Sequence, residues 1–239
     1  MYKIFSLCVV VFSVCILNAQ NASSDFKKIN SAYLKTSYTA DVCYSVFQSS
    51  ADITPLQSET GYYKLNASEK KTCMKLGQYY LINTPDFSFT LNSIEKFISF
   101  SKNKANTKLN SNSYKNTELM LKMVDTLLHY SKSVKYNEIS SKLGEYILFP
   151  GFGDYNKVRI RFDRYNFLIT EIEFFYKRNQ NLTNIAGKEA KPRLKIVYSN
   201  IVVNPTFTKD DFSYLQYLNE SDGKYSLKSS YSNYTLSCN

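Results

Sequence analysis

Apolar and polar residues alternate one by one along much of this chain, and a period of two is typical of half-buried β-strands. The clearest example is VRIRFDRYNFLITEIEFFYKR, residues 158–178, in which Val158, Ile160 and Phe162 alternate with charged residues. A second alternating run follows Asn166. The stretch therefore predicts two strands that fold back on each other as a β-hairpin.

The charges of this hairpin have a structural explanation. A turn about Asn166 places Arg161 opposite Glu171 and Arg159 opposite Glu173. Cross-strand pairs of opposite charge stabilise a sheet by roughly 0.2–1 kcal/mol each. We therefore interpret these residues as the solvated outer face of a sheet rather than as a catalytic site, and expect any function on the apolar face.

Other segments show the same period between Asn, Ser, Pro and Gly turn signals. These predicted strands cover residues 38–48, 60–66, 70–83, 87–92, 96–102, 144–150 and 193–204. In the first of them, Ala40, Val42, Tyr44 and Val46 are expected on one face. The rhythm is typical of an antiparallel meander.

Two segments have a helical period instead. Residues 23–37 carry an apolar stripe that includes Phe26 and Ile29, and residues 117–133 carry one that includes Met123 and Leu127. The chain is therefore predicted to be mainly β with helices, an α+β protein built on an antiparallel sheet.

The first 20 residues have the features of an export signal. Lys3 is followed by the apolar run IFSLCVVVFSVCIL and by the small-residue region NAQ. The run is too short for a membrane anchor, and bulky Val14 argues against lipidation at Cys15. We expect cleavage near Gln20, one domain over residues 21–222, and a polar tail or an added strand over 223–239.

The chain is strongly basic. Its formal net charge is +10, of which Lys3 contributes one. A basic, tyrosine-rich surface is a feature of nucleic-acid-binding proteins. An exported protein, however, meets anionic lipids and acidic proteins rather than nucleic acid. We therefore expect no nucleic-acid partner and place most lysines on a solvated sheet surface.

Three cysteines remain after the signal, an odd number for an oxidising compartment. In a simple meander one strand separates Cys43 from Cys73, and that distance exceeds what a disulfide allows. The alternation of apolar and polar residues places both cysteines on polar faces. Cys238, near the C-terminus, is the less constrained disulfide partner for either of them. No CxxC motif indicates a metal or redox site.

The residues of common active sites are sparse. His129 is the one histidine, on the polar face of the second predicted helix, and we interpret it as an exposed surface residue. One histidine excludes multi-histidine zinc sites and disfavours a Ser-His-Asp triad. The sequence has no GxSxG, P-loop or Rossmann motif, and GFGD at 151–154 is interpreted as a turn. We predict a protein without catalytic residues, metal or cofactor.

Aromatic residues are abundant instead, with 21 Tyr and 16 Phe. The inward-facing apolar residues form either an ordinary core or, together with the second helix, the wall of a cavity for an apolar ligand. The candidates for that cavity are Tyr44, Val46, Tyr63, Leu65, Met74, Leu76, Phe87, Phe89, Met120, Met123, Leu127, Phe162, Ile172 and Phe174.

Several local sequence patterns follow one another in an order that is informative about the family. They are GYYKLNASEKKTCMKLGQYYLIN at 61–83, FSFTLNSIEKFISFSK at 87–102, YILFP at 146–150, the hairpin, and NIVVNPTFTKDDFSYL at 200–215. With the order helix, meander, helix, hairpin, strand, they resemble the LolA family of periplasmic lipoprotein carriers over residues 25–218. The match lies in order and spacing. The family's arginine after the second strand is absent, because the chain has Leu65-Asn66-Ala67 there.

The resemblance implies a curved antiparallel sheet that forms an incomplete barrel closed by helices. It implies a monomeric periplasmic carrier or chaperone that binds acylated lipoproteins or lipids and meets envelope membrane proteins. Each buried CH₂ of an acyl chain would contribute roughly 0.8 kcal/mol. The missing arginine puts a regulated lid in doubt. The same fold serves non-enzymatic sensor or interaction proteins, which are the alternative, and a hydrolase is a distant third.

Overall fold

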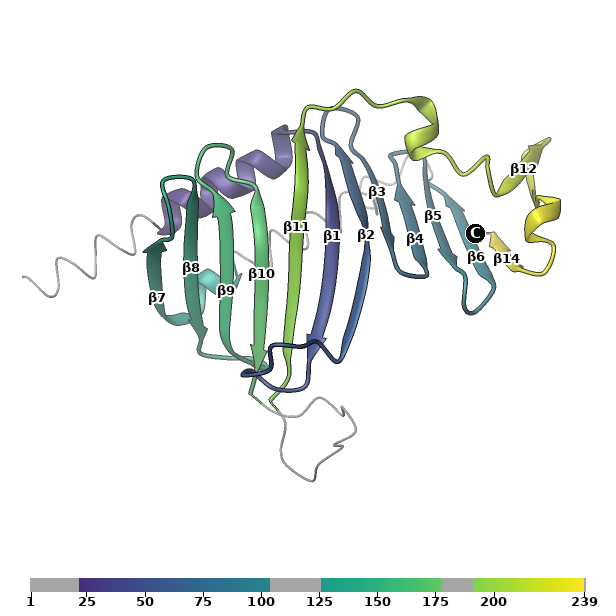
Figure 1. Cartoon of the computed structure of the whole chain (residues 1–239). Helices are drawn as coiled ribbons and strands as arrows, with labels where there is room; N and C mark the ends of the chain where they lie inside the picture. The colour runs from purple at the N-terminus through teal and green to yellow at the C-terminus, as the bar shows by residue number, and fades with distance from the viewer. Residues whose placement is uncertain (1–21, 104–125, 178–190, 239) are drawn as a thin grey trace, which may run out of the picture. The chain divides into compact units, whose positions relative to one another are not determined.

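The computed structural model describes residues 22–103, 126–177 and 191–238 (Figure 1). The predicted export signal and the candidates Met120 and Met123 lie outside these residues. The strands are β1 Tyr38–Phe47, β2 Gln57–Asn66, β3 Lys71–Leu76, β4 Tyr79–Asn83, β5 Phe87–Asn92, β6 Phe97–Lys102, β7 Ser131–Glu138, β8 Leu143–Pro150, β9 Tyr155–Asp163, β10 Ile169–Tyr176, β11 Arg193–Val203, β12 Leu218–Ser221, β13 Lys224–Leu227 and β14 Thr235–Cys238. The helical segments are 22–35, 126–129, η1 Lys209–Phe212 and η2 Ser229–Tyr231.

The prediction of a mainly β, antiparallel chain is confirmed. Every strand pair with a described register is antiparallel except β14 with β6, which is parallel. No described helix is long and apolar enough to cross a membrane. The incomplete barrel closed by helices, and the domain limits at residues 20 and 222, stay predictions.

The chain divides into two compact units. Unit 1 comprises Met1–Ala32, Ser45–Ser58 and Leu121–Val197, and unit 2 comprises Tyr33–Tyr44, Glu59–Met120 and Tyr198–Asn239. In unit 1 the strand order is β11-β10-β9-β8-β7, and in unit 2 it is β14-β6-β5-β4-β3-β2-β1-β11. Strands β1, β2 and β11 contribute residues to both units.

The predicted hairpin is β9 and β10, with the expected register. Arg161 pairs with Glu171 and Arg159 with Glu173. Alternate residues of β9 point to the other face, where Val158, Ile160 and Phe162 are buried. Period two therefore set the register here, because only one register buries all the apolar residues on one side.

The apolar face of unit 1 packs against the N-terminal helix, described over residues 22–35 where the sequence predicted 23–37. Its buried side chains recur at helical spacing, at Ala22, Phe26 and Ile29. The ring of Phe26 lies 5.1 Å from that of Tyr146 in β8. The Tyr146 hydroxyl donates a hydrogen bond of 2.8 Å to the Asp25 carboxylate. The helix therefore completes a core layer of unit 1.

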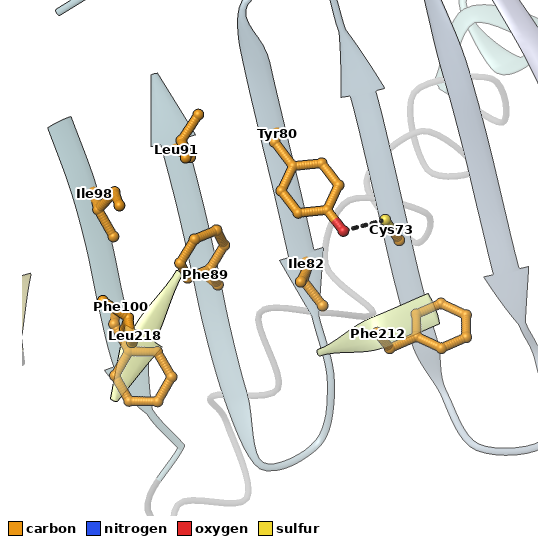
Figure 2. Packing of buried hydrophobic residues seen from close by; sticks show 9 residues of the cluster. All are labelled: Cys73, Tyr80, Ile82, Phe89, Leu91, Ile98, Phe100, Phe212 and Leu218. Carbon is orange, nitrogen blue, oxygen red and sulfur yellow. Dashed lines mark hydrogen bonds between the residues drawn. The ribbon is translucent and has the colours of Figure 1, made fainter. Parts of the chain in front are cut away.

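In unit 2, residues 212–238, which we call the C-terminal segment, pack on one face of β3–β6. We call this the covered face. Its buried residues include Cys73, Tyr80, Ile82, Phe89 and Phe100, and Phe212 and Leu218 of the C-terminal segment join the same cluster (Figure 2). The tail predicted as polar or as an added strand therefore contains β13 and β14, with β14 on the edge of β6.

Two local predictions were wrong, and in β1 the burial departs from a simple alternation. Beyond Val42 the buried residues are Ser45 and Phe47, whereas Tyr44 and Val46 are half-buried. Residues 131–133, placed in a helix, begin β7, which pairs with β8. Cys73 is buried among apolar side chains and does not lie on a polar face. In each place tertiary packing outweighed the local pattern.

Position 61 of β2 requires glycine for a steric reason. A Cβ atom at this position would lie 1.8 Å from the backbone oxygen of Lys75 in the neighbouring strand β3. Only glycine allows the two backbones to approach this closely.

Candidate functional site

The structure divides the fourteen cavity candidates among different surroundings. In unit 1, Phe162, Ile172 and Phe174 are almost completely buried, as is Leu127 at the end of the second helix. The Tyr155 ring lies 5.0 Å from that of Phe174. These side chains are placed as ordinary core residues.

Phe87 and Phe89 lie on the covered face of unit 2. Phe89 stacks on Tyr217 with 4.9 Å between ring centroids, and Phe87 meets Tyr214 at 4.8 Å. Both partners belong to the C-terminal segment. The chain's own tyrosines therefore occupy the surface that these phenylalanines would offer to a ligand.

Four candidates share the opposite face of unit 2, which we call the Met74 face. The pairs Tyr63–Met74, Leu65–Thr72 and Gly61–Leu76 place Tyr63, Leu65, Met74 and Leu76 on one side of β2 and β3. Leu65 is buried, whereas Tyr63, Met74 and Leu76 are half-buried. This is the largest group of the predicted residues that the described chain brings together on a face distinct from a filled core.

The Met74 face extends beyond the predicted residues. Met74 pairs with Leu81, which is also half-buried, so that Tyr63, Met74 and Leu81 form an apolar row across β2, β3 and β4. Leu81 was not among the predicted cavity residues. The alternation in YYLIN nevertheless indicates that its side chain points away from those of Tyr80 and Ile82. Farther along the sheet the row continues as Thr90. The apolar surface therefore ends at a polar border.

Tyrosines border the other end of this row. The Tyr38 ring lies 5.7 Å from that of Tyr33 and 5.6 Å from that of Tyr63. Burial, followed by the neighbouring phenols, raises the pKa of Tyr38 well above its usual range, and burial likewise raises that of Tyr198. The phenols therefore stay protonated at neutral pH. The Met74 face combines an apolar row with uncharged hydroxyl groups.

The charged face of the hairpin is more buried than predicted. The Glu173 side chain is 0% exposed, and it pairs with Arg159, with Arg193 at 3.2 Å and with Lys195 at 4.0 Å. Arg193 also donates a 2.8 Å hydrogen bond to the backbone oxygen of Asp52 and lies 3.9 Å over the Phe47 ring. The solvated outer face was therefore a wrong prediction, because residues 47–52 pack on it.

Glu145 joins this network from β8. Its carboxylate accepts hydrogen bonds of 2.8 Å from Arg161 and 2.9 Å from Asn137. Burial alone would raise the pKa of Glu145, but these donors and the arginine charges outweigh it and hold the pKa below its usual value. With every carboxylate paired to a cation, the network serves the structure and offers no general acid–base pair.

A pH dependence follows from the lowered pKa of Glu145. A depressed carboxylate pKa adds stability that is complete above the unfolded pKa, near 4.5, and is lost as pH falls through the folded pKa. We expect Glu145→Gln to lower the free energy of unfolding at pH 7, and the difference from wild type to shrink below about pH 4.5. Urea titrations between pH 3 and 7 measure it. Glu138→Gln, at an exposed pair with Arg164, is the control; a pH-independent difference for Glu145→Gln would contradict the expectation.

The other sequence candidates for chemistry lie apart. His129 is exposed, beside the Tyr130 ring. Cys43, Cys73 and Cys238 form no disulfide bond among the described residues, and β2 separates the strands of the first two as expected. Within residues 22–103, 126–177 and 191–238, no group of three His, Cys, Asp or Glu side chains could hold a metal ion.

Comparisons with known proteins give structural similarity only. No family model and no curated protein matches the sequence. The chain is similar to MucB in complex with MucA(peri), with 7% identity, a TM-score of 0.49, and coverage of 80% of this chain and 59% of that chain. A further structure names that pair as Pseudomonas aeruginosa MucA/MucB. The chain thus spans little more than half of MucB.

Two further structures match nearly over their whole length. The LolA superfamily protein NE2245 from Nitrosomonas europaea has 11% identity, a TM-score of 0.33, and coverage of 82% of this chain and 98% of that one. The Mycobacterium tuberculosis lipoprotein LppX has 10% identity, a TM-score of 0.40, and coverage of 77% and 96%. A LolA superfamily protein is thus among the solved structures to which the chain is similar.

Proposed function

We propose that this protein is a non-catalytic carrier of the periplasm that binds acylated lipoproteins or lipids, with the acyl chain on the Met74 face. The observation that carries the proposal is the half-buried row of Tyr63, Met74 and Leu81 on the face opposite a filled core. Methionine adapts to apolar ligands of varied shape. The half-buried Tyr63 phenol supplies a hydrogen bond for a polar head group, and the buried Tyr38 ring packs behind it.

The export signal of the sequence supports the location, and the paired carboxylates of unit 1 support a role without catalysis. Each CH₂ of an acyl chain that leaves water on this face contributes roughly 0.8 kcal/mol. Several such groups give useful affinity without any reactive residue.

The test is binding of a fluorescent fatty-acyl probe to purified protein. We expect Met74→Asp to weaken probe binding by tenfold or more, because a carboxylate in the apolar row loses its hydration when the chain binds. Ile53→Asp is the matched control, since Ile53 is 94% exposed in unit 1. Its probe affinity should equal that of wild type. Equal affinity in a folded Met74→Asp variant would remove the Met74 face as the acyl site.

A second candidate function is a sensor or interaction protein that docks another envelope protein. The observation in its favour is the burial of Phe162 and Phe174 in the core of unit 1, which removes two residues from the expected cavity. Native mass spectrometry of protein expressed in the periplasm separates the two functions. Acylated cargo that co-purifies supports the carrier, and apo protein with a stable protein partner supports the sensor.

A further inference from the structure

A cavity of about 540 Å³ lies at one end of the covered face of unit 2. Its volume is in the range of sites for small organic ligands. The wall comes from two parts of the chain, the β2–β5 sheet and the C-terminal segment. The lining residues are Tyr62, Lys75, Gly77, Gln78, Tyr79, Tyr80, Leu91, Ser93, Gln216, Tyr217, Tyr231 and Tyr234. We call it the tyrosine cavity.

Aromatic rings dominate the wall. From the sheet side, the Tyr80 ring lies 5.5 Å from that of Tyr217. Tyr217 is 5.1 Å from Tyr231, and Tyr231 is 5.3 Å from Tyr234. Mutual packing holds these rings in place, so that a ligand meets preformed flat surfaces rather than mobile side chains.

The remaining wall is polar. Gln78, Ser93, Gln216 and Lys75 contribute amide, hydroxyl and ammonium groups, and the Ser93 hydroxyl donates a hydrogen bond to the Gln78 side-chain oxygen. Leu91 is the one aliphatic side chain among the lining residues, and none of these residues carries a carboxylate. Burial raises the pKa of Tyr80 and Tyr217, so both phenols remain uncharged donors at neutral pH.

This composition selects one class of ligand. An acyl chain or a proline-rich peptide requires aliphatic surface, and Leu91 alone supplies little. A cationic ligand would meet Lys75 without a carboxylate to balance it, and Lys96 already lies 4.9 Å over the Tyr234 ring. A sugar ring has a flat C–H face for tyrosine and hydroxyl edges for amides, hydroxyls and ammonium groups.

We infer that the tyrosine cavity is a binding site for a short saccharide. It lies on the covered face and is separate from the proposed acyl site on the Met74 face, since Tyr62 and Tyr63 point to opposite sides of β2. The sugar faces stack on the tyrosines, and Gln78, Gln216 and Lys75 bind the hydroxyl edges.

The experiment is a titration of the full exported chain with neutral tetrasaccharides of glucose and of N-acetylglucosamine and with a uronic-acid tetrasaccharide, followed by calorimetry or NMR. We expect at least one of them to bind. Tyr234→Ala should weaken that binding about tenfold through the loss of one stacking surface. Tyr234 is half-buried at the end of the row of rings, where it packs on Tyr231, and an unchanged far-UV circular dichroism spectrum checks that the variant keeps its fold. A preference for the uronic-acid chain would locate its carboxylate at Lys75.

Tyr165→Ala is the matched control, because Tyr165 is 71% exposed in the β9–β10 turn, outside the cavity. It should bind saccharide as wild type does, and Tyr234→Ala should retain affinity for the fatty-acyl probe. No binding of any tetrasaccharide at about 10 mM, or equal binding by Tyr234→Ala, would overturn the inference. Binding of a proline-rich peptide that Tyr234→Ala abolishes, without saccharide binding, would also overturn it. None of these results bears on the acyl site.

Discussion

Glu173→Ala is expected to destabilise unit 1 by about 3–5 kcal/mol, because removing one member of a buried ion network leaves the others uncompensated. The Glu173 side chain is 0% exposed, and Arg159 and Arg193, both pairing with it, are only 25% and 15% exposed. Without the carboxylate, two guanidinium groups lose a partner that water replaces only in part. The measurement is the free energy of unfolding in urea at pH 7.

Glu138→Ala is the control for this experiment. Glu138 pairs with Arg164 on the surface, where its side chain is 54% exposed. An exposed pair contributes at most about 1 kcal/mol and is screened by salt. A loss below about 1 kcal/mol for Glu173→Ala would mean that water reaches the network and that the outer face is solvated after all.

Phe89→Ala is expected to destabilise unit 2 by about 3–5 kcal/mol, through lost burial and the cavity it leaves. Phe89 is 0% exposed. It contacts Tyr80 of the sheet at 6.2 Å and Tyr217 of the C-terminal segment at 4.9 Å. The substitution therefore weakens the attachment of that segment as well as the sheet. Thermal or urea unfolding followed by near-UV circular dichroism measures the change.

Ile94→Ala, at a residue 72% exposed in the same unit, should change stability by less than about 0.5 kcal/mol. Because Phe89 faces away from Met74, the folded Phe89→Ala protein should bind the fatty-acyl probe like wild type. Weaker probe binding at unchanged stability would instead place the acyl site on the covered face.

The sequence was most informative where a strand is apolar on one side only. The β9–β10 register followed from period two, because a slip by one residue would bury Arg159 and Arg161 on the apolar side. The same rule failed to show that the charged side is covered. The contacts there come from Phe47, which ends the predicted strand 38–48, and from Asp52 in the polar loop after it, and neither carries a periodic signal of that contact.

The C-terminal segment was the least predictable part. Strands β12, β13 and β14 have four residues each, too few to establish a period. The tyrosines of this segment are half-buried against a cluster on β3–β6, and β6 ends at Lys102, 116 residues before β12 begins at Leu218. That Phe89 and Met74 lie on opposite faces of the sheet could be found only from the strand registers. In the sequence both residues belong to apolar runs, and both were expected on the inward face.

The attachment of β14 to β6 has a consequence for the order of folding during synthesis. Strands β3–β6 leave the ribosome well before residues 212–238, which cover their aromatic side. Until then Ile82, Phe89 and Phe100 remain exposed on a sheet whose β6 edge is unpaired, a combination that favours aggregation. An exported chain that crosses the membrane unfolded avoids this interval, because both partners are then present when folding begins.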